Sequence, residues 1–259
     1  MTDSYTIPDL RGKRALVTGS TMGIGAAVAK ALAAHGALVG VNGATHAARG
    51  QAIVDAIRRD GGTAELVMGD LSQRGSPEKV VGDLVTAFGG LDILVNNAGG
   101  IINRTLIGDI SNDFFDQVLD LNIRALVMTT KAAVAEFRKN ENGGVIVNTT
   151  SIAARNGGGP GGSLYASSKA FMSNFTRSMA RELAPDNIRV NAISPGTVAT
   201  ETNLKYHPPE MLEKTRLTIP MQRIGVEDDC IGTYLYLASG SLSGYVTGQV
   251  IELNGGQIM

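Results

Sequence analysis

Short apolar runs alternate with longer amphipathic stretches along most of the chain. Short apolar runs bounded by turn residues are typical of buried strands, and longer stretches with apolar positions three or four apart are typical of helices. The predicted strands are Arg14–Thr18, Leu38–Asn42, Ala64–Met68, Leu91–Val95, 145–149, Ile188–Ile193 and Gln249–Leu253. The predicted helices are Ala26–His35, 46–60, 77–88, 112–138, 163–184 and 226–238.

This alternation of strands and helices predicts an α/β fold: a doubly wound parallel sheet of the Rossmann type with helices on both faces. No change of composition marks a linker, so we expect one domain over residues 1–259. Residues 201–224 contain Pro208, Pro209 and Pro220, and we predict that they form a mobile insert that acts as a substrate lid.

A glycine-rich turn separates the first predicted strand from the first predicted helix. Its residues are Gly19, Ser20, Thr21, Met22, Gly23, Ile24 and Gly25. In such a turn, glycines let a pyrophosphate approach the backbone and let the helix pack closely on the strand. The N–H groups and the positive dipole end of the helix favour phosphate. The glycines could be turn residues alone, but their context predicts nucleotide binding.

The end of the second strand is where a carboxylate selects NAD in this kind of fold, by binding the adenosine ribose. The residues at this position are Gly43, Ala44, Thr45 and His46. None of them is acidic. No arginine directly follows Gly43, and Met22 is not basic, so the sequence offers no firm clamp for a 2′-phosphate. Thr45, His46 and Arg49 could contact a 2′-phosphate, although His46 could also be a solvated loop histidine. The sequence therefore predicts NADP or NAD, with a lean to NADP or dual use.

Tyr165 and Lys169 are four residues apart, so in a helix their side chains project from one face. A free tyrosine has a pKa near ~10, and a neighbouring cation lowers it. Such a tyrosine can act as a general acid or base on a hydroxyl or carbonyl group. Ser151 follows a predicted buried strand, and the C-terminal ends of strands are where open α/β sheets bind ligands. The same spacing also arises by chance, so the prediction depends on the other motifs.

Polar residues follow two more of the predicted strands. Asp70, which precedes Leu71, could hold an adenine amino group or cap the next helix. Asn96 and Asn97 could bind a cofactor or tie strands together through backbone hydrogen bonds. Asn122 lies in the middle of the long predicted helix, a position that structural needs alone can explain.

Composition and charge exclude several classes of function. A net charge of −1 gives no basis for a nucleic-acid or anionic-membrane partner. The single cysteine, Cys230, cannot form a disulfide within the chain, and the absence of paired cysteines and of a His-Glu-x-x-His motif argues against a metal. A hydrolase and a phosphotransferase are disfavoured because their glycine-containing motifs are missing. No signal-peptide or membrane-spanning apolar stretch is present, so we expect a cytoplasmic protein.

Taken together, the motifs resemble the short-chain dehydrogenase/reductase family over about residues 10–256. The matching segments are Thr18-Gly19-x-x-x-Gly23-Ile24-Gly25, Asp70-Leu71, Asn96-Asn97-Ala98-Gly99, Asn122, Ser151, Tyr165-x-x-x-Lys169, Pro195-Gly196-x-x-x-Thr200 and the closing pair Tyr245-Val-Thr-Gly248 and Asn254-Gly-Gly256. Each segment is weak alone, but the set in the family's order is specific. The resemblance implies an NAD(P)-dependent oxidoreductase.

The resemblance also implies a role for each matching residue. Tyr165 is the implied acid/base, and Lys169 would bind the nicotinamide ribose and lower the pKa of the tyrosine. Ser151 would hydrogen-bond the substrate oxygen, and Asn122 would hold a water in a proton relay to Lys169. The implied cofactor-binding residues are Gly19, Ser20, Thr21, Met22, Gly23, Ile24, Gly25, Gly43, Ala44, Thr45, Asp70, Leu71, Asn97, Ala98, Gly99, Tyr165, Lys169, Pro195, Gly196, Val198 and Thr200.

By the same resemblance, residues 153–162 and 197–219 are expected to line the substrate pocket. The serine-to-tyrosine gap is 14 residues, one more than in many family members, which enlarges the glycine-rich loop before the tyrosine. Arg155 is therefore expected to contact the substrate, together with Ser151 and Tyr165. Thr150 is an alternative for the serine.

The predicted reaction is reversible hydride transfer between a nicotinamide cofactor and a secondary alcohol or its carbonyl compound. Polar residues on the substrate side favour a sugar, polyol or other small hydroxy compound. The overall pattern also resembles 3-oxoacyl-[acyl-carrier-protein] reductases, and a non-catalytic dinucleotide-binding regulator is a third interpretation. Family members are usually tetramers or dimers, so the resemblance implies a homotetramer or homodimer that pairs through helices 112–138 and 163–184.

Overall fold

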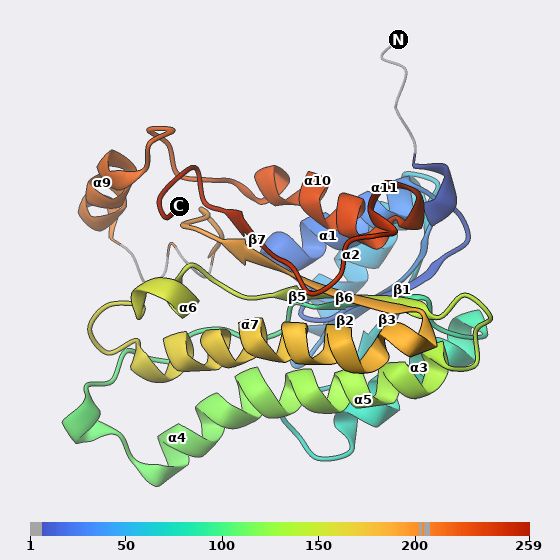
Figure 1. Ribbon diagram of the computed structural model, residues 1–259, viewed down its shortest axis with the longest axis horizontal. Helices are drawn as coiled ribbons and strands as arrows, with labels where there is room; N and C mark the ends of the chain where they lie inside the picture. The colour runs from blue at the N-terminus through green and yellow to red at the C-terminus, as the bar shows by residue number, and fades with distance from the viewer. Residues whose placement is uncertain (1–6, 202–203, 205–207) are drawn as a thin grey trace.

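The computed structural model describes residues 7–201, 204 and 208–259. Within these residues, a seven-stranded parallel sheet lies between two layers of helices (Figure 1). The strand order is β3-β2-β1-β4-β5-β6-β7, with every neighbouring pair parallel. This confirms the predicted doubly wound sheet, and it brings the C-terminal ends of all strands to one edge, where such sheets bind ligands.

The observed elements follow the predicted ones closely. The strands are β1 (Arg14–Val17), β2 (Leu38–Gly43), β3 (Thr63–Met68), β4 (Ile93–Asn96), β5 (Gly144–Thr149), β6 (Ile188–Pro195) and β7 (Val250–Leu253). The α-helices are α1 (Gly23–Ala34), α2 (Ala47–Arg59), α3 (Ser76–Phe88), α4 (Asn112–Leu119), α5 (Ala125–Phe137), α6 (Ala153–Asn156), α7 (Ser163–Leu183), α9 (Pro209–Thr218), α10 (Glu227–Ala238) and α11 (Gly240–Ser243). The short turns η1 (Pro8–Leu10), η2 (Ile107–Asp109) and η4 (Ala184–Asp186) complete the 3-10 segments.

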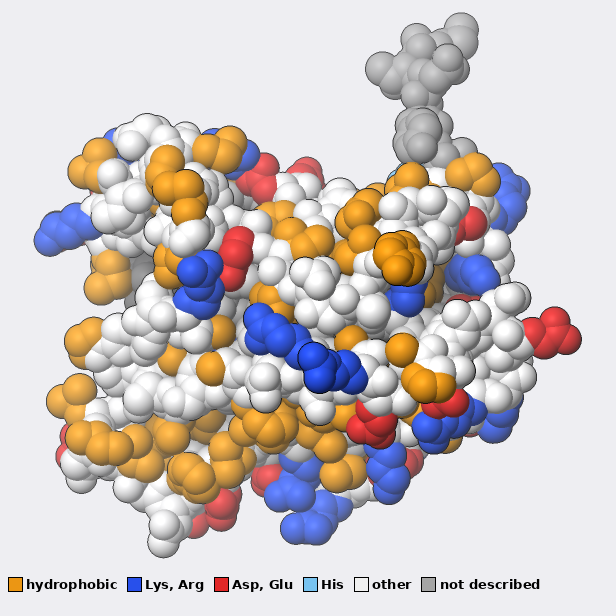
Figure 2. All heavy atoms as spheres, in the orientation of Figure 1, with side chains coloured by type: hydrophobic (Ala, Val, Ile, Leu, Met, Phe, Trp, Pro, Cys, Tyr) orange, Lys and Arg blue, Asp and Glu red, His pale blue; other side chains and the backbone are white. Residues whose placement is uncertain are grey.

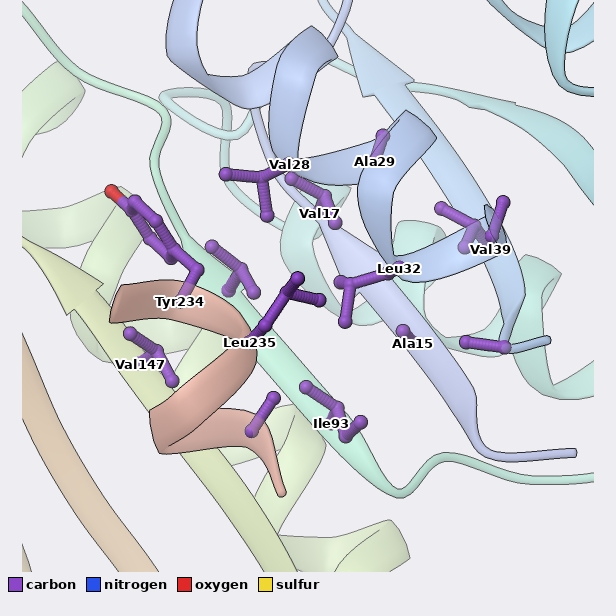
Figure 3. Packing of buried hydrophobic residues seen from close by; sticks show 14 of the residues in the cluster. Ala15, Val17, Val28, Ala29, Leu32, Val39, Ile93, Val147, Tyr234 and Leu235 are labelled. Atoms are coloured by element: carbon purple, nitrogen blue, oxygen red, sulfur yellow. The ribbon is translucent and has the colours of Figure 1, made fainter. Parts of the chain in front are cut away.

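Alternating residues of the strands build a hydrophobic layer on each face of the sheet. On one face, Ala15 and Val17 of β1 pack with Leu32 of α1 and Leu235 of α10 (Figure 3). On the other face, Leu16 belongs to the layer beneath α3, α5 and α7. The sheet is therefore packed on both faces, and this packing fixes the positions of the residues at its C-terminal edge.

The predicted helix over residues 112–138 is not one regular helix. Helices α4 and α5 are joined by a five-residue π-helical segment, η3 (Asp120–Arg124), with the buried residue Asn122 at its centre. The prediction of a regular helix was wrong here because Asn122 makes hydrogen bonds to Gly100 outside the helix, and widened turns of this kind accompany such insertions.

The insert predicted over residues 201–224 contains a regular helix, α9, followed by the buried residue Ile219. Residues 202–203 and 205–207 of the insert lie outside the described residues. The mobility of the insert and its role as a lid stay predictions.

Candidate active site

The turn between β1 and α1 has the backbone conformation that its glycines suggest. Gly19 and Gly23 have φ angles of 60° and 55°, in the left-handed region that favours glycine. A Cβ atom on Gly25 would collide with the carbonyl oxygen of Gly19 and the amide of Asn97. The helix therefore approaches the sheet as closely as a nucleotide-binding turn requires.

A cleft of about 530 Å³ opens over this turn at the C-terminal edge of the sheet. It takes in the ends of strands β1, β2, β4, β5 and β6 and the first turns of the segments that follow them. The predicted cofactor residues that line it are Gly19, Thr21, Met22, Gly23, Ile24, Gly43, Ala44, Thr45, Asn97, Ala98, Gly99, Tyr165, Lys169, Pro195, Gly196, Val198 and Thr200. A cradle of this shape and composition fits an extended dinucleotide whose pyrophosphate lies on the glycine turn.

Four of the predicted cofactor residues do not line the cleft: Ser20, Gly25, Asp70 and Leu71. The hydroxyl of Ser20 is buried, donates to the carbonyl of Val17 and accepts from the backbone N–H of Asn42. Leu71 belongs to the hydrophobic core. Ser20 and Leu71 therefore stabilise the protein next to the cleft and are not part of its lining.

The carboxylate of Asp70 accepts hydrogen bonds from the backbone N–H and the hydroxyl of Ser72 at 3.0 and 2.7 Å. The residue before α3 is Gly75, so the interpretation of Asp70 as the N-cap of that helix was wrong. Asp70 instead stabilises a local turn, and a contact between Asp70 and adenine stays a prediction.

Ser151, Tyr165 and Lys169 all line the cleft, Ser151 after β5 and the other two from α7. The hydroxyl of Ser151 lies close enough to the phenol of Tyr165 to act on its pKa, and it accepts the backbone N–H of Ala153 at 3.1 Å. The hydroxyl of Thr150 is engaged elsewhere, because it donates to the carbonyl of Lys169 at 2.8 Å. The structure thus pairs Ser151, and not Thr150, with the tyrosine.

Lys169 is buried, and its Nζ donates to the carbonyl of Thr149 at 2.7 Å. Nζ lies 5.8 Å from the ring centre of Tyr165. Burial disfavours the charged ammonium and lowers the pKa of Lys169 to about 8. The lysine is therefore held at a fixed distance from the tyrosine, and its charge changes near neutral to mildly alkaline pH.

Burial raises the pKa of Tyr165, and the nearby hydroxyl of Ser151 opposes this effect without cancelling it. The expected lowering of this pKa by Lys169 is not observed in the protein alone. The physical reason is that removing the phenolate from water costs more than the serine hydroxyl returns. The phenol is accordingly a proton donor in the resting site.

Asn122 is buried, and its side chain is tied to the loop that lines the cleft. Its Oδ1 accepts the N–H of Gly100 at 2.9 Å, and its Nδ2 donates to the carbonyls of Gly100 and Val118, both at 3.1 Å. A Cβ atom on Gly99 would lie 2.8 Å from Asn122 Oδ1 and 3.6 Å from Lys169 Nζ. Asn122 therefore positions the Gly99–Gly100 segment beside Lys169, and the relay water stays a prediction.

The arginine expected at the substrate is not the one that lines the cleft. Arg155 contacts the carboxylate of Glu252 and the carbonyl of Met259, both at its guanidinium. Arg104 lines the cleft instead, and its Nη1 donates to the carbonyls of Gly158 and Pro160 at 3.2 and 3.1 Å. Sequence reasoning missed Arg104, although its place on the loop after β4 was a usable signal, because loops at this edge border the ligand.

Ile101 and Gln257 also line the cleft and were not singled out beforehand. Asn156, Thr197 and Thr215 line it as well, and they lie within the ranges 153–162 and 197–219 that were expected to border the substrate. His46, considered only as a 2′-phosphate contact or a loop residue, also lines the cleft. Among the described residues that line it, none is acidic.

Two features were not found among the described residues. No group of three or more His, Cys, Asp or Glu residues that could hold a metal ion occurs within residues 7–201, 204 and 208–259. No helix in that part of the chain has the length and apolar character needed to cross a membrane.

Comparison with known proteins agrees with this geometry. A family model described as Enoyl-(Acyl carrier protein) reductase matches residues 19–257. The 3-oxoacyl-[acyl-carrier-protein] reductase of Synechocystis sp. is 35% identical over 250 residues, which cover 96% of this chain and 98% of that protein.

Two solved structures are also similar. The NADH-dependent reductase A1-R′ responsible for alginate metabolism has 38% identity and a TM-score of 0.90, with 97% of this chain and 99% of that chain covered. A short chain dehydrogenase from Burkholderia cenocepacia J2315, in complex with NADP, has 36% identity and a TM-score of 0.89, with 96% and 99% covered.

The fold and the cleft define the class of protein as a nicotinamide-dinucleotide oxidoreductase. The chain belongs to the short-chain dehydrogenase/reductase family. It is therefore an NAD(P)-dependent dehydrogenase or reductase that acts on CH–OH or carbonyl groups.

Proposed function

We propose that the protein interconverts a secondary alcohol, such as a sugar, a polyol or another hydroxy compound, and its ketone, with Tyr165 as the acid/base. The observation that carries this proposal is that Ser151, Tyr165 and the buried Lys169 lie together in the lining of one cleft, with Lys169 Nζ 5.8 Å from the ring centre of Tyr165. A substrate oxygen placed between the two hydroxyls could accept both hydrogen bonds.

The nicotinamide cofactor, when bound, supplies or accepts the hydride. Its pyrophosphate would be held by the turn from Gly19 to Gly25, and its nicotinamide end by residues around Val198. In reduction, the Tyr165 phenol gives its proton to the carbonyl oxygen, and in oxidation the phenolate removes the proton of the alcohol. Ser151 donates a hydrogen bond to the same oxygen and keeps it in line with the phenol.

Lys169 would assist the phenolate that forms when Tyr165 has given up its proton. Below pH 8 the lysine carries its positive charge, and a cation near a phenolate stabilises it. The carbonyl of Thr149 orients the ammonium and leaves its remaining N–H bonds for other partners.

Polar groups at the substrate side favour a hydroxylated substrate. Arg104, Asn156 and Gln257 line the same cleft as Ser151 and can donate hydrogen bonds to hydroxyl or carbonyl oxygens. A site built to hydrogen-bond a substrate rejects analogues that lack those groups, because its own polar atoms are then left unpaired. These residues support a sugar or polyol over a plain alkyl ketone.

A 3-oxoacyl-[acyl-carrier-protein] reductase is the second candidate. It is favoured by the Synechocystis relative that carries this name, with 35% identity along almost the whole chain. The two candidates separate in an assay that follows nicotinamide absorbance. Oxidation of a sugar or polyol with NAD or NADP would support the first, and reduction of 3-oxoacyl thioesters alone would support the second.

Tyr165→Phe tests the proposed acid/base. We expect turnover to fall by about 10²- to 10⁴-fold, the usual contribution of general acid–base catalysis, while nucleotide binding measured by calorimetry stays unchanged. The control is Tyr236→Phe in α10, which removes a phenol outside the cleft lining and should leave turnover intact. Retention of more than a few per cent of activity by Tyr165→Phe would contradict the role.

A further inference from the structure

An ion pair joins two segments that are 152 residues apart in the sequence. Arg49 lies in the first turn of α2, and its Nη1 donates to Oε1 and Oε2 of Glu201 at 3.3 and 3.1 Å. Its Nη2 also donates to Oε1, at 3.3 Å. Both carboxylate oxygens are therefore engaged by one guanidinium, the geometry in which an arginine binds carboxylate or phosphate most selectively.

This ion pair joins the two walls of the cleft. On one wall, α2 follows the lining residues Gly43–His46, and a Cβ atom on Gly50 would lie 3.2 Å from the methyl of Thr21. On the other wall, Glu201 follows Thr200, whose methyl would lie 3.6 Å from a Cβ atom on Gly23. Arg49 and Glu201 thus meet close to the turn that would hold the pyrophosphate, beside the wall expected to face the adenosine ribose.

The chemistry of the pair bears on the ribose 2′ position. In dinucleotide folds a carboxylate at the end of the second strand selects NAD, and a nearby arginine accommodates the 2′-phosphate of NADP. This chain has no acid at Gly43–Thr45, but Glu201 brings a carboxylate from the opposite wall and occupies Arg49, a cation suited to a 2′-phosphate.

We infer that Glu201 is a cofactor-selecting residue that disfavours NADP by holding Arg49 in an ion pair and by repelling a 2′-phosphate. Removing its charge releases the guanidinium, which can then bind the phosphate through both of its outer nitrogens. The inference rests on the proposed nicotinamide-dependent function, and it reverses the lean toward NADP that the sequence alone suggests.

Nucleotide binding tests the inference without turnover. Calorimetry would compare NADH with NADPH, and 5′-AMP with 2′,5′-ADP, because each pair differs only by the 2′-phosphate and the second pair lacks the nicotinamide half. In Glu201→Gln we expect the Kd of NADPH and of 2′,5′-ADP to fall by about three- to tenfold, and that of NADH and 5′-AMP to change by less than about twofold. Exposed ion pairs contribute modestly, so a larger change is not expected.

Two further variants make the result specific. Glu213→Gln in α9 removes an exposed carboxylate that is also paired with an arginine, Arg216, and should leave all four Kd values unchanged. The double variant Arg49→Gln/Glu201→Gln should lose the gain in NADPH affinity, because the freed guanidinium is gone.

Three outcomes would overturn the inference: equal changes for NADH and NADPH, the same gain in Glu213→Gln, or a gain that persists in the double variant. If neither NADH nor NADPH bound, the proposed function on which the inference rests would be overturned instead. The first of these three outcomes, with NADH still bound, would reject the inference and leave the proposed function standing.

Discussion

Residues of the same type take different roles here because of their surroundings. Lys169 is buried and has its pKa lowered to about 8 by loss of hydration, whereas Lys139 is exposed and forms a surface ion pair with Glu136. Arg104, on the loop after β4, and Arg155, in α6, both lie near the cleft, yet only Arg104 lines it. Residue identity and spacing therefore select candidates, and the immediate contacts decide what each one can do.

The lowered pKa of Lys169 predicts a pH-dependent stability. The unfolded lysine titrates at about its ordinary value of 10.5 and the folded one at about 8, so between these pH values the unfolded chain binds more protons. The free energy of unfolding contributed by Lys169 therefore rises with pH in this window, by about 1 kcal/mol per pH unit near its centre.

Lys169→Met isolates this contribution. Cys230 and Tyr234 have raised pKa values, so above about pH 9 they make the folded state less stable as pH rises, and they do so in both proteins. Urea unfolding at several pH values from 7 to 9 should show wild type gaining stability relative to Lys169→Met. A difference that is constant over this range would contradict the buried, titrating lysine.

At the scale of elements, the π-helical break between α4 and α5 holds the loop that follows β4. The π-helical segment η3 lets the buried side chain of Asn122 reach Gly100, which follows β4. That contact fixes the loop between β4 and η2 against Lys169 of α7. The irregularity thus connects three elements at the cleft, which a regular helix would not do.

Asn122→Ala tests this connection. Loss of the side chain leaves the backbone N–H and carbonyl of Gly100 without their observed partners, so we expect the free energy of unfolding to fall by about 1–3 kcal/mol. Turnover should fall as well, because the Gly99–Gly100 segment would no longer be held beside Lys169. Urea unfolding and steady-state kinetics on the same preparation measure both effects.

A matched control is Asn103→Ala, which removes an exposed amide from the same loop. It should change stability by less than about 0.5 kcal/mol, as surface substitutions usually do. Equal effects of the two substitutions would contradict a special role for Asn122.

At the scale of the whole molecule, hydrophobic side chains gather on the face formed by α4, α5 and α7 (Figure 2). Phe171 and Phe175 stack with ring centres 5.7 Å apart, and Phe171 and Phe115 are 40% and 41% exposed. Large exposed apolar residues that cluster on one face are typical of protein–protein contacts. This face supports the homotetramer or homodimer implied by the family.

Phe171→Asp tests the assembly. Placing a charge on this face should shift the protein from a tetramer or dimer toward the monomer in light scattering at micromolar concentration, because a buried unpaired carboxylate is costly. Leu242→Asp, an equally exposed apolar position on α11, is the control and should not change the mass. A monomeric wild-type protein would contradict the proposed assembly.

Much of this protein was predictable from sequence because the signals are local. The alternation of apolar strands with amphipathic helices determined the doubly wound sheet, since each pattern depends on neighbouring residues. The glycine turn was predictable because its backbone angles exclude most side chains. Tyr165 and Lys169 share one helix face because residues four apart always do.

Only the tertiary structure decided which distant groups meet. The pairing of Ser151 with Tyr165, the place of Arg104 in the cleft and the bridge from Arg49 to Glu201 join segments far apart in the chain. The pKa of Tyr165 is raised above its ordinary value, and not lowered, because the folded chain buries the phenol. Local patterns carry no record of such contacts, because they arise from how the packed elements place loops at the edge of the sheet.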